Sequence, residues 1–201
     1  MRIGIIGAGS VARGITHLAT PRNHQVILSN SRGPGSLAAL AAELGPQVTA
    51  GTVADAAKAE LVVLAVPWQA VPSAVSGVPP WNDRIVVDAT NQYVSDDGTL
   101  KLADLGGRTS SEIVAGLLPG ARVVKAFNTL PVAIFERPQE AGGRRVLFVS
   151  GDDAAAKRTV RVLLEELGFA AIDLGSLRDG GTIQQAGGPL GGKNLIMLPA
   201  R

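Results

Sequence analysis

The stretch MRIGIIGAGSVARG, residues 1–14, predicts how the chain begins to fold. Residues 3–6 form a short, continuous apolar run, which is typical of a strand buried on both faces of a sheet. The six residues that follow, Gly7-Ala8-Gly9-Ser10-Val11-Ala12, match the pattern G-x-G-x-x-A. In this geometry the first glycine makes a tight turn, the second lets a ligand approach the backbone, and the alanine keeps the next helix close to the strand. The stretch therefore predicts a strand, a turn and a helix.

The beginning of that helix is suited to bind phosphate. The N–H groups of Ser10 and Val11 would point at a pyrophosphate, and the positive end of the helix dipole would add to the attraction. The alternative is a glycine-rich turn without a ligand. The pattern lies directly after a strand and a second strand follows at the right distance, which favours dinucleotide binding. The predicted pyrophosphate contacts are Gly7, Ala8, Gly9, Ser10, Val11 and Ala12.

Short apolar runs alternate with amphipathic stretches along the rest of the chain. Such alternation predicts an α/β fold with a doubly wound, mostly parallel sheet and helices on both faces. The clearest helix is expected at 153–167, where Asp153 can cap the start and Gly168 can end it. We expect one domain over residues 1–201, in which 175–201 is an irregular C-terminal segment. Further strands are expected at 26–28, 61–66, 85–87, 123–126, 146–149 and 170–172, and further helices at 11–19, 37–44, 70–75 and 111–117.

Composition narrows the class of protein. A chain of 201 residues with 46% hydrophobic residues can bury a core, and a net charge of +2 gives no reason to expect a nucleic-acid or membrane partner. There are no cysteines and two histidines, so we expect no disulfide, no thiolate nucleophile and no metal site. No apolar run is long enough to span a membrane and no leader-like segment begins the chain, so we expect a cytoplasmic protein. Homodimerisation is left open.

The end of the second predicted strand lacks the acid that NAD-binding sites usually place there. About 20 residues past the first glycine, where Asp or Glu would bind the ribose 2′-hydroxyl, the chain has Ser29, Asn30, Ser31 and Arg32. A carboxylate would repel a 2′-phosphate, whereas hydroxyl, amide and guanidinium groups bind phosphate oxygens. A polar loop without a ligand is the alternative. Together with the upstream turn, the segment predicts NADP(H) rather than NAD(H).

Other strand ends are candidates as well, because ligands of open α/β sheets lie across the carboxyl ends of the strands. Trp68 follows one strand end and could pack along a cofactor or anchor a loop. The amide and hydroxyl groups after two later strands can bind a nicotinamide carboxamide or serve as turn caps. Asn128 and Thr129 are the candidates to face the nicotinamide and its acceptor. Further predicted cofactor contacts are Ala65, Val66, Pro67, Thr90, Ala126 and Asn128.

Six segments of the chain carry a family resemblance: IGIIGAGSVARG, SNSRGP, AVPW, VVDATN, VVKAFNTLP and VSGDDAAAKRTVRVLLEELGF. They resemble the NADPH-dependent reductases of coenzyme F420, a deazaflavin. The resemblance implies a Rossmann-type NADP-binding fold in which Ser29, Ser31 and Arg32 bind the 2′-phosphate. It also implies that the segment with Asn128 and Thr129 faces the nicotinamide and the deazaflavin. The segments follow the family order over nearly the whole chain.

Two features differ from the family pattern, and both concern the acceptor. Asn128 stands where some members have histidine. Members commonly continue after "GPL" into a long helix that helps to close the deazaflavin site, whereas here only residues 191–201 follow.

The expected function is an oxidoreductase that transfers a hydride between NADPH and a small-molecule redox acceptor, either coenzyme F420 or a flavin. Hydride transfer needs two aligned rings more than it needs a protein acid or base, since the cofactor carries the chemistry. An NADP(H)-binding sensor or partner-regulated module without its own acceptor is the alternative. A dehydrogenase of small carbonyl compounds is disfavoured because no strong proton donor is evident near the strand ends.

Overall fold

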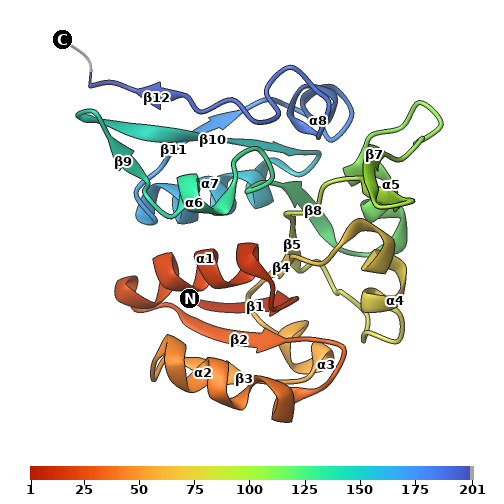
Figure 1. Cartoon of the computed structure of the whole chain (residues 1–201), viewed down its shortest axis with the longest axis vertical. Helices are drawn as coiled ribbons and strands as arrows, with labels where there is room; N and C mark the ends of the chain where they lie inside the picture. The colour runs from red at the N-terminus through yellow and green to blue at the C-terminus, as the bar shows by residue number, and fades with distance from the viewer. Residues whose placement is uncertain (200–201) are drawn as a thin grey trace.

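A ten-stranded sheet forms the centre of the protein (Figure 1). The computed structural model describes residues 1–199, without the side chain of Asp96; the last two residues of the predicted C-terminal segment lie outside this description. Along the main path of the sheet the strand order is β11-β10-β8-β5-β4-β1-β2-β3. These strands are β1 (Arg2–Ile6), β2 (Gln25–Ser29), β3 (Val48–Ala50), β4 (Leu61–Leu64), β5 (Ile85–Asp88), β8 (Arg122–Lys125), β10 (Gly143–Gly151) and β11 (Ala170–Asp173).

The strand order identifies the point where the chain changes direction across the sheet. From β1 the chain proceeds outward through β2 and β3, then returns to place β4 on the other side of β1 and continues through β5 to β8. All of these pairs are parallel, and β10 is antiparallel to β8. The predicted doubly wound, mostly parallel α/β fold is confirmed. In such sheets the switch point, here between β1 and β4, opens a crevice at the carboxyl ends of the strands.

Helices cover both faces of the sheet, each with its own apolar core. Since successive side chains of a strand point to opposite faces, Ile5 belongs to one core and Ile6 to the other. Helices α1 (Ser10–Ala19), α2 (Ala38–Leu44), α6 (Val132–Phe135) and α7 (Ala154–Glu166) pack on the Ile5 face, and α3 (Val53–Ala56), α4 (Val71–Val75) and α5 (Ser110–Leu117) pack on the Ile6 face.

The C-terminal segment is more regular than predicted. It contains helix α8 (Asp179–Gln184) and strand β12 (Ile196–Met197), which pairs antiparallel with β10. The glycines that hide the helical pattern have a packing role. A Cβ on Gly180 would lie 2.5 Å from the Ser150 hydroxyl, so α8 approaches β10 more closely than a larger residue would allow. The expectation of an irregular tail is therefore wrong for these two elements.

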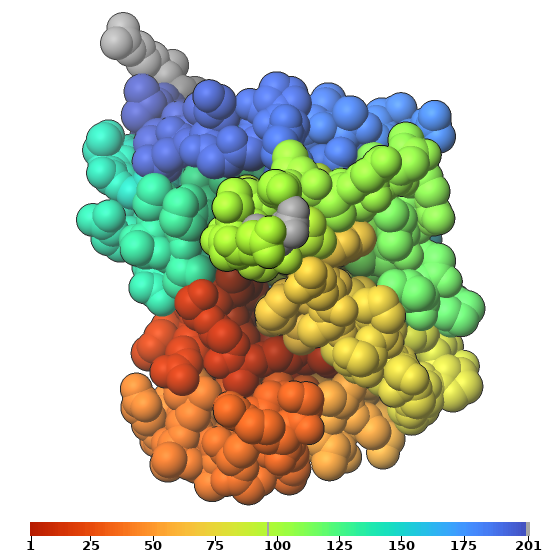
Figure 2. Space-filling model, turned by 45° about the vertical axis from the view of Figure 1, so that its right-hand side comes forward, coloured from red at the N-terminus to blue at the C-terminus, as the bar shows by residue number. Residues whose placement is uncertain are grey.

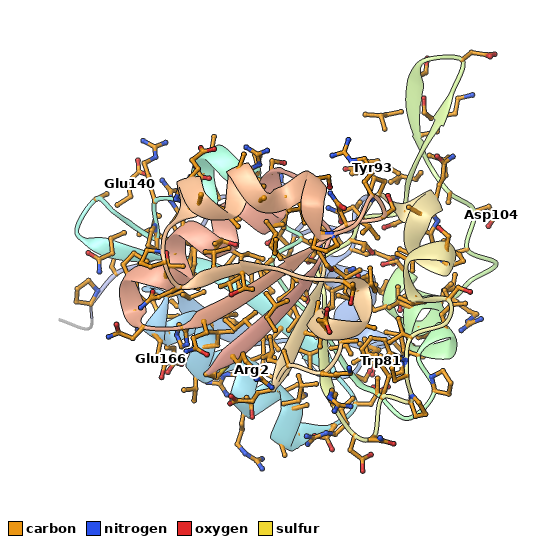
Figure 3. All side chains as sticks on the ribbon, turned by 90° about the horizontal axis from the view of Figure 1, so that it is seen from below. Arg2, Trp81, Tyr93, Asp104, Glu140 and Glu166 are labelled. Atoms are coloured by element: carbon orange, nitrogen blue, oxygen red, sulfur yellow. The ribbon has the colours of Figure 1, made fainter. Side chains whose placement is uncertain are left out.

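Several short elements also went unpredicted. The most prominent is the hairpin of β6 (Tyr93–Asp96) and β7 (Thr99–Leu102), which projects from the body of the molecule (Figures 1 and 3). The others are β3, α3, α6, β9 (Gln139–Glu140) and the single-turn helices η1 (Thr20–Arg22), η2 (Pro34–Leu37) and η3 (Trp68–Ala70). Each is two to four residues long, too short for a periodic pattern.

Within the described part of the chain, no helix combines the length and apolarity needed to cross a membrane.

Helix α7 follows the sequence prediction closely. The Asp153 carboxylate caps it by accepting the N–H of Ala156 at 2.6 Å, and Gly168, with φ of 98°, lies just beyond its end. The predicted stripe is fully buried: Val160, Leu163, Leu164 and Leu167.

Truncation of this stripe should therefore destabilise the fold. We expect Leu163→Ala to lower the free energy of unfolding by about 2–5 kcal/mol, because it leaves a cavity in a packed core. The neighbouring Val162, which is 51% exposed on the same helix, is the matched control. Val162→Ala should change stability by less than about 0.5 kcal/mol. Urea denaturation followed by circular dichroism measures both, and equal losses would contradict the assignment of the two faces.

Candidate functional site

A groove of about 550 Å³ lies at the switch point of the sheet. It begins at the turn after β1, passes Ala65, Val66 and Pro67 after β4, and is continued by small apolar side chains of α3 and α4. Figure 2 shows the hollow between the N-terminal segment and the segment around α4. We call it the switch-point groove. Its size and concave, mostly apolar lining are those of a small-molecule site.

Gly7 and Gly9 of the turn are suited to their positions for different structural reasons. Gly7 has φ of 121°, and a Cβ there would lie 2.1 Å from the carbonyl oxygen of Ala65. A larger residue would push β1 and β4 apart at this point. A Cβ on Gly9 would meet nothing within 4 Å, so the backbone at Gly9 faces open space. A ligand can therefore approach this turn as closely as the sequence pattern predicts.

The N-terminus of α1 is left without a side-chain cap. Its N-cap residue is Gly9, and no acidic side chain lies in its first turn. Thr109, by contrast, caps α5 with its own side chain, and Asp153 caps α7. The first N–H groups of α1, which include Ser10 and Val11, are thus free of side-chain partners and suited to an anion. Ala12 is buried beneath them, as expected for close contact between helix and strand.

The loop after β2 divides the predicted phosphate contacts into two groups. Ser29 is fully buried and its hydroxyl donates to the Ile5 carbonyl oxygen at 2.9 Å, so it braces the sheet and is not exposed to a ligand. Asn30 accepts the N–H of Arg32 at 2.9 Å and donates to the hydroxyl of Ser36 at 2.9 Å, which fixes the shape of the loop. Ser36 thus closes this loop, while the N-cap position of α2 belongs to Leu37.

The side chains of Ser31 and Arg32 are exposed, and Ser31 lines the groove with Asn30. Within the described residues, the guanidinium of Arg32 makes no ion pair. Of the four predicted residues, these two are the ones the structure leaves available for a phosphate. Trp68 does not line the groove; it packs against the core on the α3–α5 face, as a loop anchor would.

A second cavity, of about 310 Å³, lies at the ends of β5 and β8. We call it the β5–β8 pocket. The C-terminal segment supplies one wall, so the tail after α8 is part of the site. The lining residues are Asn91, Tyr93, Asn128, Thr129, Leu130, Pro131, Ala186, Gly187, Gly191 and Gly192.

The amide of Asn128 is committed to the protein itself. Its Nδ2 donates to Asn91 Oδ1 at 3.2 Å and to the Gln184 carbonyl oxygen at 3.0 Å, and its Oδ1 accepts from Gln184 Nε2 at 2.9 Å. Both N–H groups have acceptors within the described residues, so in this arrangement neither is free for the predicted contact with a nicotinamide. The residue instead joins β8, the β5 loop and α8.

Thr129, a buried residue that lines the β5–β8 pocket, has a hydroxyl that is not committed to the protein. Its backbone oxygen accepts the N–H of Gly192 at 2.8 Å, whereas its hydroxyl makes no hydrogen bond to the described residues. The chain reaches this position through Phe127, whose φ of 63° is rare for a bulky residue. Phe127 is held by burial against Phe135, with ring centroids 6.1 Å apart. The unusual backbone thereby turns Asn128 and Thr129 toward the pocket.

A buried ion pair lies directly behind the pocket. Lys125 Nζ donates to Asp88 Oδ2 at 3.0 Å and to the Thr90 carbonyl oxygen at 3.0 Å, and both charged side chains are fully buried. Asp88 also accepts from the Ser111 hydroxyl at 2.5 Å and from the N–H and hydroxyl of Thr90. Burial raises the pKa of Asp88, but Lys125 and the donors from Ser111 and Thr90 outweigh it and hold the pKa below its usual value.

This network uses two further predicted contacts. Thr90 is 2% exposed and its hydroxyl serves Asp88, and Ala126 is fully buried. Neither side chain is accessible to a cofactor, so both residues support the pocket wall from inside the protein. Gln184, which sequence reasoning missed, connects the parts: its Nε2 also donates to the Phe148 carbonyl oxygen at 2.9 Å, and its Oε1 accepts from the Ser150 hydroxyl at 2.7 Å. Its glycine-rich surroundings carried no signal of this role.

Comparison with known proteins connects this geometry to a family. Residues 2–92 match the family model described as "NADP oxidoreductase coenzyme F420-dependent". The crystal structure of a proposed F420-dependent NADP-reductase from Arthrobacter sp. FB24 is 31% identical, with a TM-score of 0.78, covering 88% of this chain and 86% of that one. The hypothetical protein SMa0349 of Sinorhizobium meliloti is 44% identical, with a TM-score of 0.91, covering 98% and 96%.

A curated relative is much longer. Metalloreductase STEAP3 of Rattus norvegicus is 31% identical over 176 residues, which are 88% of this chain but 34% of the rat protein. The chain thus spans about a third of the length of that relative.

Removal of one partner of the buried Asp88–Lys125 pair should destabilise the fold. We expect Lys125→Met to lower the free energy of unfolding by about 3–5 kcal/mol, because it leaves the Asp88 carboxylate buried without a counter-charge. The double variant Asp88→Asn/Lys125→Met should recover much of this loss, since no isolated charge remains. Urea denaturation at neutral pH measures both variants, and a double variant no more stable than Lys125→Met would contradict the account.

The pH dependence of stability provides a second test of the Asp88–Lys125 pair. A carboxyl whose pKa is lowered by folding stabilises the protein above its unfolded pKa of about 3.9, and that stabilisation is lost as the pH falls through the folded pKa. The difference in free energy of unfolding between the wild-type protein and the double variant should therefore shrink below about pH 4. A constant difference down to pH 2 would show that Asp88 does not titrate in this way.

Proposed function

Since the chain belongs to the family of NADP oxidoreductases dependent on coenzyme F420, we propose that it reduces a deazaflavin or a flavin with NADPH. The observation that carries the proposal is the placement of the two cavities. The switch-point groove ends at β4 and the β5–β8 pocket begins at β5, and these two strands are direct neighbours in the sheet. Two ligands at one edge of the sheet can meet there ring to ring.

The groove fits NADPH at each of its parts. The open backbone at Gly9 and the uncapped start of α1 would hold the pyrophosphate. Ser31 and Arg32 would bind the 2′-phosphate, and no carboxylate lies at the end of β2 to repel it. Ala65, Val66 and Pro67 would direct the nicotinamide toward the β5–β8 pocket. Bound NADPH supplies the hydride, so the residues of the chain need only bind and align.

The β5–β8 pocket would hold the acceptor ring. The Thr129 hydroxyl can donate to a ring carbonyl or nitrogen, and Tyr93 and Leu130 offer apolar surface to its faces. Among the described residues no Asp, Glu, His or Lys lines the pocket, so the proton that accompanies the hydride would come from water. The balance is then one NADPH, one acceptor and one proton converted to NADP⁺ and the reduced acceptor. The chain contributes alignment and exclusion of bulk solvent.

Turnover with defined acceptors tests this function. The protein is mixed with NADPH and, in separate reactions, with coenzyme F420, FMN or riboflavin, and NADPH oxidation is followed at 340 nm. We expect steady turnover with at least one ring acceptor. The rat relative is named a metalloreductase, so a ferric chelate is included as a non-ring acceptor.

The competing function is a binding module that senses NADP(H) without an acceptor of its own. It predicts saturable NADPH binding with no oxidation by any of these acceptors, which would overturn the proposed reductase. Steady turnover on a ring acceptor would eliminate the sensor, and turnover on the ferric chelate alone would argue against a ring in the β5–β8 pocket.

The cofactor assignment leads to a separate test at Arg32. We expect Arg32→Ala to weaken NADPH binding by at least about tenfold, since a charge-assisted hydrogen bond contributes roughly 1.5–3 kcal/mol. NADH binding should change little, because NADH has no 2′-phosphate. Arg2→Ala, at the amino end of β1 and thus the opposite edge of the sheet, is the control. Isothermal titration calorimetry measures all four values; equal losses for both nucleotides would remove Arg32 from the 2′-phosphate site.

A further inference from the structure

The side-chain amide of Gln184 joins the C-terminal segment to the sheet. Gln184 is the last residue of α8 and is fully buried where α8 lies against the carboxyl end of β10 (Figure 1). Its Nε2 donates to the carbonyl oxygens of Phe148 at 2.9 Å and Lys125 at 3.3 Å, and to Asn128 Oδ1 at 2.9 Å. Its Oε1 accepts the Ser150 hydroxyl at 2.7 Å. Three oxygens around the nitrogen and a donor at the oxygen give the amide one orientation.

This amide lies where two strands of the sheet part. β8 and β10 are antiparallel, and the pair that Lys125 makes with Ser150 is the last before β8 ends. Gln184 donates to backbone oxygens of both strands at this point. The chain that leaves β8, which carries Asn128 and Thr129, is thus tied to β10 through α8.

The sequence of α8 favours close contact over helix stability. Gly180 and Gly181 lie within this six-residue helix, and each glycine costs a helix roughly 1 kcal/mol relative to alanine. A Cβ on Gly180 would lie 2.5 Å from the Ser150 hydroxyl oxygen, and one on Gly181 would lie 3.2 Å from the Thr109 hydroxyl oxygen. The two glycines therefore let α8 approach β10 and α5 closely enough for Gln184 to reach the sheet.

From these observations we infer that Gln184 is a positioning residue of the acceptor site. It acts through Asn128, whose Nδ2 also donates to the Gln184 carbonyl oxygen at 3.0 Å, on the adjoining Thr129. It also fixes the end of α8, from which the chain continues into Ala186 and Gly187 of the pocket wall. An apolar side chain could fill the same space, but it would not specify where these groups lie. The inference rests on the proposed function, because the ring would occupy this pocket.

Gln184→Glu tests the inference with almost no change of shape. A carboxylate accepts from Ser150 as the amide does, but it has no proton to donate to the three oxygens around Nε2. At pH 9 we expect KM for riboflavin to rise about tenfold, as the loss of one or two hydrogen bonds would give. If only deazaflavins are reduced, 5-deazariboflavin takes the place of riboflavin.

The same variant should leave the nucleotide half unchanged. Among the described residues, none that lines the switch-point groove forms a hydrogen bond with Gln184. The Kd of NADP⁺, measured by titration calorimetry, should therefore change by less than about twofold. A general loss of structure would weaken both ligands together.

The pH profile of this variant provides a second readout. Burial raises the pKa of a carboxyl, and a protonated carboxyl can again donate one hydrogen bond. The ratio of the variant KM to the wild-type KM should therefore fall at least about threefold between pH 9 and pH 6. Lys125 and Asp88, the charged groups of this network, pair with each other. Arg178 and Asp179, where α8 begins, are exposed.

Gln185→Glu is the matched control, because it makes the same chemical change at the next residue. Gln185 does not line the β5–β8 pocket, and its Oε1 accepts the Ser110 N–H at 3.0 Å. A carboxylate keeps that bond, so the KM ratio should stay within about twofold of one at every pH. Ser150→Ala is a milder second variant, should Gln184→Glu fail to fold. It removes only the donor to Gln184 Oε1 and should raise KM for riboflavin about threefold, with NADP⁺ binding unchanged.

Equal losses for riboflavin and NADP⁺ would reduce Gln184 to a structural role. A KM like that of Gln185→Glu, or a KM ratio that stays constant with pH, would overturn the inference while the proposed function stands. If the wild-type protein reduces no ring acceptor, the proposed function fails and the inference is judged by binding. Fluorescence quenching then gives the Kd of riboflavin in the presence of NADP⁺. A Kd that Gln184→Glu weakens in the same pH-dependent way supports the positioning role, whereas an unchanged Kd or no binding refutes it.

Discussion

The ion pair between Asp88 and Lys125 is the constraint on which the site edge of the sheet depends. Two opposite charges without solvent contact are tolerable only when further hydrogen bonds support them. Here Ser111 and Thr90 donate to Asp88, and the Thr90 carbonyl oxygen gives Lys125 a second acceptor. These bonds fix the ends of β5 and β8 and the start of α5 relative to one another. A pair of this kind contributes position more than net stability, because desolvation offsets much of its attraction.

The two halves of the site are built on different principles. The switch-point groove is made by backbone: a glycine turn, an uncapped helix and small side chains, with Ser29 and Asn30 as internal braces. The β5–β8 pocket is held by side-chain amides, because Asn128 forms hydrogen bonds with both Asn91 and Gln184. The groove thus depends on backbone features that many dinucleotide sites share, whereas the pocket depends on contacts between particular side chains.

Sequence patterns predicted the fold and the position of the glycine turn, because those features are local. Gly7 and Gly9 have their meaning within one turn, and the stripe of α7 within one helix. The acceptor half could not be predicted in the same way. Nothing in the sequence near Asn128 indicates that Gln184, 56 residues later, forms hydrogen bonds with the Asn128 amide. Likewise, nothing near Ser29 shows that the Ile5 carbonyl oxygen accepts the Ser29 hydroxyl. Polar residues at strand ends were correctly located, but their partners decided their roles.

The attachment of α8 through Gln184 has a consequence for how the molecule moves. Helix α8 is six residues long and rests on the sheet largely through this one side chain and the glycines beside it. Short elements with few buried side chains are among the first to open in local unfolding. Detachment of α8 would remove one wall of the β5–β8 pocket and release Asn128, yet leave the glycine turn and α1 untouched. The β5–β8 pocket would then lose its shape while the switch-point groove keeps its own, so the two cavities are mechanically independent.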